Sequence, residues 1–534
     1  MKRYKIALFI IIAVSAAVGS CSKLLDVTPD EVLLKEDYLG NDRLDARAAL
    51  FGVLSQMQDL STQYLILGEL RGDLMDVTTE AIDELRQVSQ HNVAEGNKYA
   101  TVADFYSIIN NCNFALKGMD TAAYESGLMP VYASLLRVRT WVFLQVAINY
   151  GSVPYITDPI ESSADLEKEF PLLSFDETMD ALIADILPVS TIDNVSTYDN
   201  SLSFVIYSLI PDKDLLLGDL YNWKNDYVNG ATSYKAFLDR YTSGSSAKYN
   251  LTSKYGVTYS VSNFVYNITN NWKNIYQTTI QTDEIVNYIP FSRTYRQTNS
   301  GFNLLTKQVK SSEAAFRNWD KQFKIHNNIL FDSLDTRAIM ADRTSGKILK
   351  YLDNYIVYTR VPTVYIRLAE MINRAGFPDH ALSIINKGVK DDAVTSGAPR
   401  FVGNLETYLN FTQTKYYVVS SSGVASGGNL GVRGRVGMAP VSIAAQATLA
   451  DSIKAVEMLI LNEAALESAF EGSRWADLTR IATRNNDPSI LADAVANKFS
   501  LAGDNALAAS IRTKLMDINN WYLPLEIPAN FVEQ

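Results

Sequence analysis

The stretch from Ile453 to Arg484 limits the possible folds more than any other, because it predicts two consecutive helices separated by one glycine. Apolar side chains recur on one face of the first helix at alternating spacings of three and four, interrupted only by Glu463. Gly472 breaks this pattern, and an apolar stripe resumes from Trp475. A chain with so long a segment of helical periodicity is expected to be mainly α-helical.

Four charged residues of alternating sign follow the flank of the second helix. Glu471, Arg474, Asp477 and Arg480 are spaced three apart, close enough on a helix to form ion pairs. One interpretation is a solvated row of surface pairs, each contributing about 0.2–0.5 kcal/mol. The other is a partly buried polar clamp that fixes this helix against its neighbours. Both interpretations assign these residues a structural role and not a catalytic one.

Composition excludes several classes of protein. The chain has 534 residues, and its hydrophobic fraction of 47% is ample for a large core. A formal net charge of −11 disfavours a nucleic-acid partner. Two cysteines cannot form a disulfide framework, and three widely spaced histidines give no zinc pattern. We therefore expect no metal and no cofactor.

The N-terminus carries the features of a secretion signal. Residues 1–20 begin with basic residues, continue with an apolar run too short to span a bilayer, and end in small residues. Val18-Gly19-Ser20-Cys21 resembles the bacterial lipobox, in which the cysteine is acylated. We predict a lipoprotein signal peptide over 1–20, lipidation of Cys21 and one domain over 21–534. The alternative is an ordinary cleavage site with an incidental cysteine.

Further helices are predicted along the chain, some of them in hairpins. The predicted segments are 41–60, 65–76 with a glycine interruption, 105–116, 131–150 and 175–187, and the predicted hairpins are 215–241 and 362–389. β-like runs occur at 284–289 and 355–358 within long insertions. The expected fold is mainly α, with degenerate tetratricopeptide-like helical hairpins, long loops and short β insertions.

Two motifs carry a resemblance to a known family. The run from Glu463 to Arg480 resembles the C-terminal signature of the SusD/RagB family, although many members have Glu-Arg where this chain has Glu463-Ala464. Arg71-Gly72-Asp73-Leu74-Met75 followed by Thr78 is similar to the N-terminal pattern of the RagB-like branch. Members of the family are surface lipoproteins that bring nutrient oligomers to outer-membrane transporters of Bacteroidetes.

The resemblance implies a binding protein and not an enzyme. It implies location at the outer membrane through a lipid anchor, a SusC-like TonB-dependent transporter as partner, and an oligosaccharide as ligand, with an oligopeptide as the alternative. The chain has no G-x-S-x-G elbow, Walker loop or H-E-x-x-H motif. A surface hydrolase and an adhesin or scaffold remain as alternatives from other classes.

Ligand-binding residues are predicted in two groups. The resemblance places the N-terminal motif near the ligand face, which makes Arg71, Asp73 and Asp76 candidates for polar contacts; the alternative is helix capping and surface ion pairs. Long loops on a rigid scaffold often carry binding residues. An aromatic platform is therefore expected from Trp272, Tyr276, Tyr295 and Trp319, with core packing as the alternative.

Overall fold

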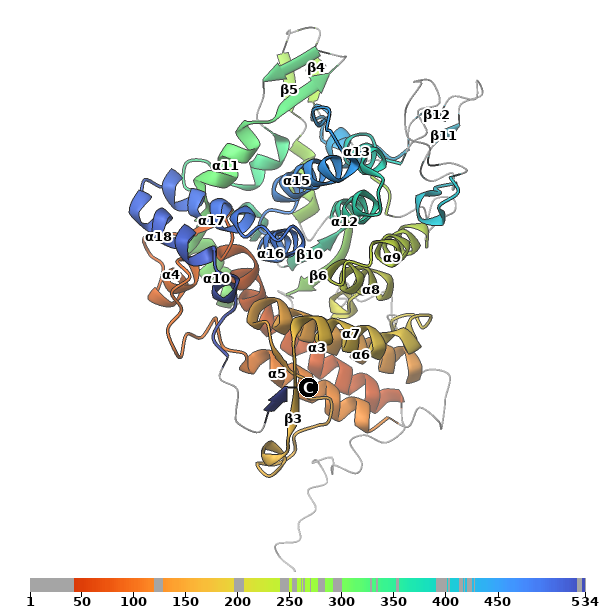
Figure 1. The fold of residues 1–534 in the computed structure, drawn as a ribbon, viewed down its shortest axis with the longest axis vertical. Helices are drawn as coiled ribbons and strands as arrows, with labels where there is room; N and C mark the ends of the chain where they lie inside the picture. Colours follow the sequence, from red (N-terminus) through yellow and green to blue (C-terminus); the bar gives the residue numbers. More distant parts are fainter. Residues whose placement is uncertain are drawn as a thin grey trace, which may run out of the picture.

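Helical hairpins stacked side by side make up most of the molecule, and short strands and irregular segments lie between them (Figure 1). The computed structural model describes residues 43–119, 128–195, 206–240, 249–251, 257–260, 262, 265–268, 270–276, 284–291, 300–326, 329–332, 335–351, 355–389, 401, 404–412, 416, 418–419, 425–426, 428–525 and 531–533. Cys21, the signal peptide 1–20 and Tyr295 lie outside the described residues. The predicted mainly α fold is confirmed.

The N-terminal helices pack into one bundle. The bundle consists of α3 (Arg43–Leu65), α5 (Ala103–Lys117), α6 (Leu128–Tyr150) and α7 (Phe175–Ile186). The start of α7 is fixed by a capping box between Ser174 and Glu177. By length and composition α6 is the one described helix that could cross a membrane, but 83% of its apolar window is buried inside the bundle. It serves as a core helix.

Both predicted hairpins are confirmed. The first consists of α8 (Lys213–Trp223) and α9 (Tyr227–Asp239), and the second of α12 (Val361–Arg374) and α13 (Pro378–Asn386). The second hairpin packs on the first through α9 and α12. Proline in the first turn of α12 and of α13 costs no hydrogen bond, because the first backbone N–H groups of a helix have no partner within it.

The C-terminal segment contains four helices in succession. The predicted pair forms α15 (Leu449–Glu467) and α16 (Arg474–Arg484), and α15 packs on α12. A further hairpin, α17 (Ser489–Leu501) with α18 (Asn505–Leu515), follows and was not predicted. The remaining described α-helices are α4 (Asp83–Ser89), α10 (Ser300–Lys307), α11 (Glu313–Asp320) and α14 (Gly431–Arg435).

Both predicted β-like runs form strands, and they pair with each other. β6 (Ile285–Pro290) and β10 (Tyr355–Arg360) are antiparallel, with Val357 opposite Tyr288. The remaining strands are β1 (Met75–Val77) with β7 (Val309–Ser311), β4 (Val257–Ser260) with β5 (Val265–Ile268), β8 (Phe323–His326) with β9 (Ile329–Asp332), β11 (Val418–Val419) with β12 (Ala425–Ser426), and a sheet of β2 (Val153–Pro154), β3 (Phe170–Leu173) and β13 (Phe531–Glu533).

The helix predicted over 65–76 is wrong in its second half. The chain continues from α3 into one π-helical turn, η1 (Ile66–Leu70), and then enters strand β1 at Met75. Pairing of β1 with β7 satisfies the backbone groups of β1 by long-range contacts that helical periodicity cannot reveal.

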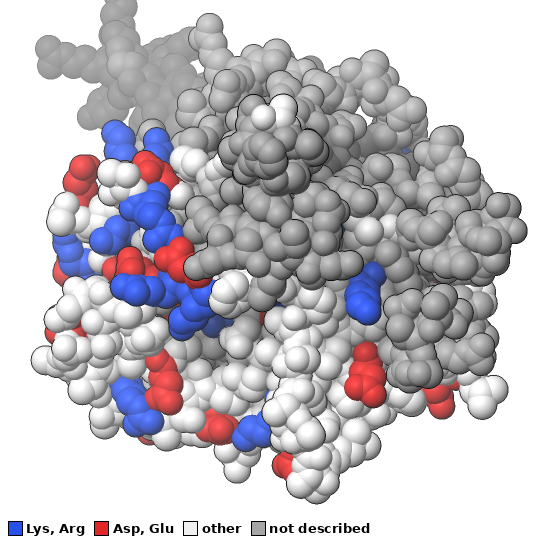
Figure 2. Space-filling model, turned by 90° about the horizontal axis from the view of Figure 1, so that it is seen from above, with Lys and Arg blue, Asp and Glu red and all other residues white. Residues whose placement is uncertain are grey.

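On the face seen in Figure 2, Lys and Arg lie interspersed with Asp and Glu over the described surface.

The turn between α15 and α16 requires glycine at position 472. Gly472 has a φ of +89°, and a Cβ there would lie 2.3 Å from Cε1 of Tyr64. Gly376, in the turn between α12 and α13, also has a positive φ, +103°, but a Cβ there would meet no atom within 4 Å. The two glycines separate the cost of backbone strain from the cost of a steric clash.

We expect Gly472→Ala to lower the free energy of unfolding by about 3 kcal/mol or more, because strain and overpacking add. Gly376→Ala introduces strain alone and is expected to cost about 1–2 kcal/mol. Urea denaturation of both variants measures the difference. Equal losses would contradict the close packing of Gly472 against Tyr64.

Candidate functional site

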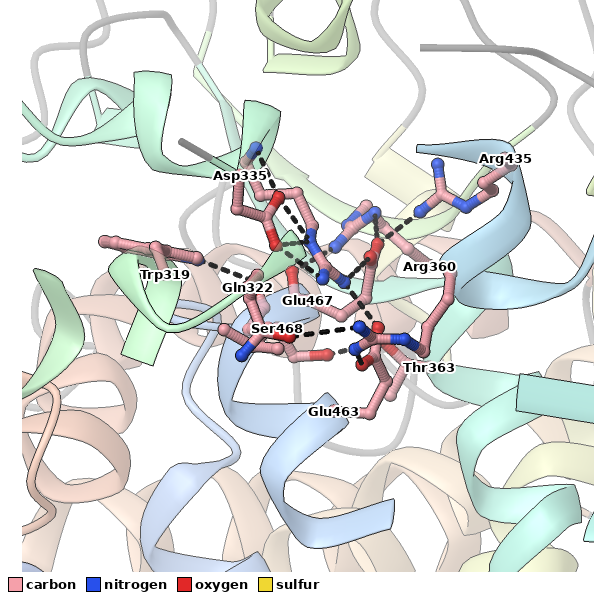
Figure 3. A network of polar contacts seen from close by, with 12 residues as sticks. Trp319, Gln322, Asp335, Arg360, Thr363, Arg435, Glu463, Glu467 and Ser468 are labelled. Atoms are coloured by element: carbon pink, nitrogen blue, oxygen red, sulfur yellow. Dashed lines mark hydrogen bonds and ion pairs between the residues drawn. The ribbon is translucent and has the colours of Figure 1, made fainter. Parts of the chain in front are cut away.

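A buried network of ion pairs surrounds the end of α15 (Figure 3). Arg337 donates to Glu463 and Glu467 at 2.7 and 3.0 Å, and Arg360 donates to Glu467 at 2.9 Å. Five carboxylates balance five cations, all at least nine-tenths buried: Glu284, Asp335, Glu463, Glu467 and Glu471 with Arg337, Lys350, Arg360, Arg433 and Arg435. We call these ten residues the central ion network.

Neighbouring cations favour the ionised form of two glutamates in the network, Glu467 and Glu471. Burial alone would raise the pKa of Glu467, but the guanidinium groups of Arg435, Arg360 and Arg337 outweigh it and lower the pKa to about 2. The same balance lowers the pKa of Glu471 through Arg360 and Lys350. Since every carboxylate has a cationic partner, the network has the features of a structural core and not of a proton-transfer site.

The charged flank of the C-terminal motif is a clamp. Glu471 lies before α16 and pairs with Lys350 and Arg360, and Arg474 pairs with Asp73 at 2.6 Å. Of the residues spaced three apart, only Asp477 and Arg480 form an ion pair, at 2.9 Å. The interpretation as a row of surface pairs is therefore wrong. Arg480 also pairs with Glu370 of α12 at 2.8 Å. The interpretation as a buried clamp is confirmed.

Glu69 of η1 holds the start of α16 and was missed in the sequence. Its carboxylate accepts from the backbone N–H groups of Phe470, Gly472 and Ser473 at 3.0, 2.8 and 3.1 Å. Burial raises the pKa of Glu69 to about 7, against the opposing effect of these hydrogen bonds. The one sequence signal was an acidic residue within the apolar run Leu65 to Leu70.

An aromatic pocket opens beside this turn. Tyr64, Trp141 and Tyr358 form a cluster in which ring centroids are 5.4 Å (Tyr64 to Trp141) and 5.9 Å (Trp141 to Tyr358) apart. All three rings are half-buried, so part of each faces the pocket. Trp223 of α8 and Tyr234 of α9 complete the aromatic lining. The cavity has a volume of about 90 Å³.

Polar groups interrupt the aromatic wall. Asp219, Arg367 and Thr363 reach the pocket from α8 and α12. Tyr234 donates to Asp219 at 2.6 Å, and Arg367 lies 2.8 Å from Asp477. The side-chain amide of Gln145 also lines the pocket and makes no hydrogen bond within the described part of the chain. Aromatic faces beside such donors and acceptors suit a ligand with both apolar faces and hydroxyl or amide groups.

The similarity of this chain to known proteins lies in its fold. No family model and no curated protein matches the sequence. A SusD superfamily protein from Bacteroides vulgatus ATCC 8482 is 12% identical, with a TM-score of 0.59 over 90% of this chain and 95% of its own. One from Bacteroides thetaiotaomicron VPI-5482 is 16% identical, with a TM-score of 0.54 over 90% of this chain and 94% of its own.

The chain has the SusD superfamily fold. A third structure with this fold, described as a candidate sugar-binding protein from Bacteroides vulgatus ATCC 8482, is 15% identical with a TM-score of 0.54, and covers 82% of this chain and 86% of its own. At these identities the likeness is one of fold and assigns no binding residue to this chain.

On the SusD fold of this chain, the predicted aromatic platform is not formed by the three described residues. The exposed fractions of Trp272, Tyr276 and Trp319 are 1%, 4% and 2%, which leaves no ring face for a ligand. The hydroxyl of Tyr276 donates to Glu471 at 2.7 Å, and Trp319 donates to the carbonyl of Leu466 at 3.2 Å. Trp272 lies beneath Arg435 of the central ion network. These rings are core, as the alternative interpretation had it.

The polar candidates of the N-terminal motif are also mainly structural. Asp73 is buried in its pair with Arg474, and Asp76 accepts from the backbone N–H of Val77 at 2.8 Å. Neither lines a described pocket, so direct ligand contacts are not supported for them. Arg71 is 2% exposed, and its guanidinium lies 4.0 Å from the ring centre of Trp475, yet it lines a second pocket.

The central ion network predicts a large cost for breaking one pair. We expect Glu467→Gln to lower the free energy of unfolding by about 3–5 kcal/mol, because Arg337, Arg360 and Arg435 then lose a buried counter-charge. Glu313→Gln is the control, since its i,i+4 pair with Arg317 is exposed and contributes about 0.5 kcal/mol or less. Urea denaturation compares the two, and similar losses would contradict the network's role.

Proposed function

We propose that this chain is a surface lipoprotein that captures an oligomeric nutrient, a glycan in the first place, and delivers it to a TonB-dependent outer-membrane transporter. The observation that carries the proposal is the aromatic pocket, in which half-buried rings lie beside polar side chains, among them the amide of Gln145. Sugar rings present apolar C–H faces, which can stack on the aromatic rings, and hydroxyl edges, which can hydrogen-bond to the polar groups.

The size of the pocket limits what it holds. Typical small-molecule sites have volumes of roughly 300–1,000 Å³, and the aromatic pocket has about 90 Å³. The pocket therefore admits one residue or one end of an oligomer, and the remainder of the ligand lies outside it. Such partial enclosure fits capture and later release to a partner better than it fits permanent storage.

Binding without chemistry follows from the groups around the pocket. Asp219 already accepts from Tyr234, and Arg367 is paired with Asp477. The pocket lining contains no histidine, cysteine or lysine. A hydrolase would need a positioned nucleophile or a general acid and base facing the ligand. The lining supports recognition, and incubation with glycans and peptides would expose any hydrolysis as smaller products.

Oligopeptides are the second class of ligand, because the C-terminal and N-terminal motifs are closer in wording to the RagB-like branch. Peptide groups also stack on aromatic rings and pair with side-chain amides. The two classes differ in a binding screen of the soluble chain, begun at Ser22, against oligosaccharides and mixed oligopeptides. Binding to neither class would favour the adhesin or scaffold alternative.

Two variants locate the binding in the aromatic pocket. We expect Trp141→Leu to weaken binding of the best ligand about tenfold or more, the loss of a ring anchor of roughly 1.4 kcal/mol. Gln145→Ala removes a side chain that makes no hydrogen bond within the described chain, so it tests the site with little effect on folding. Gln446→Ala, at an exposed position away from the pocket, is the control. Calorimetry that finds all three equal to the parent would reject this site.

Delivery to a transporter requires attachment at the membrane. The lipobox-like sequence supports acylation of Cys21, and two or more acyl chains anchor a protein stably. We expect Cys21→Ala to move the protein from the membrane fraction to the soluble fraction. Ser22→Ala, next to the acylated position, should leave it with the membrane. Fractionation of Cys21→Ala with the membrane would reject the lipid anchor.

A further inference from the structure

A second pocket, distinct from the aromatic pocket, has two cationic side chains in its lining. Its volume is about 160 Å³, and its lining includes Arg71, His91 and Lys514 together with Asn520 and Tyr522. The segment that closes it follows α18, and Arg71 precedes β1. We call it the basic pocket. No Asp or Glu is among the residues that line it.

Arg71 is held there by neutral groups. Its Nη1 donates to the side-chain oxygen of Asn149 at 3.0 Å, and its Nη2 donates to the carbonyl of Trp521. No carboxylate in the described part of the chain forms an ion pair with it. The ring of Trp475 compensates only in part, as a cation–π contact. Burial accordingly lowers the pKa of Arg71 to about 9.

Two lysines add to the uncompensated positive charge. Nζ of Lys514 donates to the carbonyl of His91 at 2.5 Å, and buried Lys498 donates to the carbonyls of Leu70 and Met75. Neither lysine forms an ion pair with a carboxylate within the described residues. The carboxylates whose charges raise the pKa of Lys498 are Asp76 and Asp73, and Asp73 is already paired with Arg474. In a chain of net charge −11, such a concentration of free cations is unusual.

His91 lies among these cations as a neutral ring. Its Nε2 lies 2.9 Å from the carbonyl of Arg71. Burial lowers its pKa well below the ordinary value, and Arg71, Lys498 and Lys514 lower it further. A neutral imidazole can hydrogen-bond the carbonyl of Arg71 without adding charge to the pocket. The positive charge in the lining of the pocket therefore comes from the guanidinium of Arg71 and the ammonium of Lys514, with buried Lys498 nearby.

We propose that the basic pocket binds a carboxylate group of a ligand. The anion supplies the counter-charge that Arg71 and Lys514 lack, and charge-assisted hydrogen bonds from both would hold it. The lining also includes asparagine and tyrosine side chains, whose amide oxygens and hydroxyl suit the uncharged remainder of the ligand. The site is separate from the aromatic pocket and does not depend on the function proposed for it.

Carboxylates of this kind come from two sources, an acidic sugar or the C-terminus of a peptide. Thermal shift of the soluble chain, begun at Ser22, compares sodium glucuronate and an N-acetylated dipeptide with glucose and sodium chloride at matched ionic strength. The expected result is a rise in melting temperature with one or both carboxylates and none with glucose or chloride. The carboxylate that raises the melting temperature identifies the source.

Two matched variants on α18 test the location. Lys514→Gln removes an exposed charge whose ammonium reaches the pocket, and it should weaken carboxylate binding about tenfold. Arg512→Gln removes the same charge from the same helix, but Arg512 pairs with Asp493 and does not line the pocket. It should bind like the parent. Equal weakening in both variants, or no response of the parent to either carboxylate, overturns the proposal.

Discussion

The structure depends on the pairing of three glutamates with arginines in the interior. Glu463 and Glu467 lie one helical turn apart at the end of α15, and Glu471 lies one further turn's length along the chain. A buried carboxylate without a partner is very costly, so this helix can be buried only where the arginines also arrive. The arginines come from η7 (Thr336–Met340), β10 and α14, which are otherwise short or irregular elements. The network thereby fixes the insertions to the helical scaffold.

The same pairing determines the shape of the aromatic pocket. Glu471 holds one side of the turn between α15 and α16, and Glu69 holds the other through backbone N–H groups. Gly472 and Ser473, which lie between these contacts, form part of the pocket wall against Tyr64. Further along α16, Arg480 lines the pocket while it is paired with Glu370 of α12. A rigid wall of this kind favours one bound geometry, because little ordering is needed when a ligand enters.

Sequence patterns predicted the scaffold because helical periodicity is local. The helices that end near Tyr150 and Arg484, and the strands at 284–289 and 355–358, follow from spacing and punctuation within each segment. The long-range partners of the charged clamp do not follow from such local patterns. Asp73 lies 401 positions from Arg474, and no pattern in either segment indicates the other.

The residues proposed to bind the ligand were harder to predict for a related reason. Trp272 and Trp319 were chosen because long insertions often bind ligands, but cations and backbone carbonyls of the core cover these rings. Tyr64, Trp141 and Tyr358 lie on regular elements and meet only in the folded chain. Residue type alone does not distinguish the two groups. Burial, which depends on all the neighbours together, separates them.

The most direct test of the account is a crystal structure of the soluble chain with an oligosaccharide that binds it. We expect a sugar ring against Trp141 and Tyr358, within hydrogen-bond reach of Gln145, and a central ion network in the same arrangement as in the unliganded chain. A sugar bound elsewhere, with the aromatic pocket left empty, would contradict it.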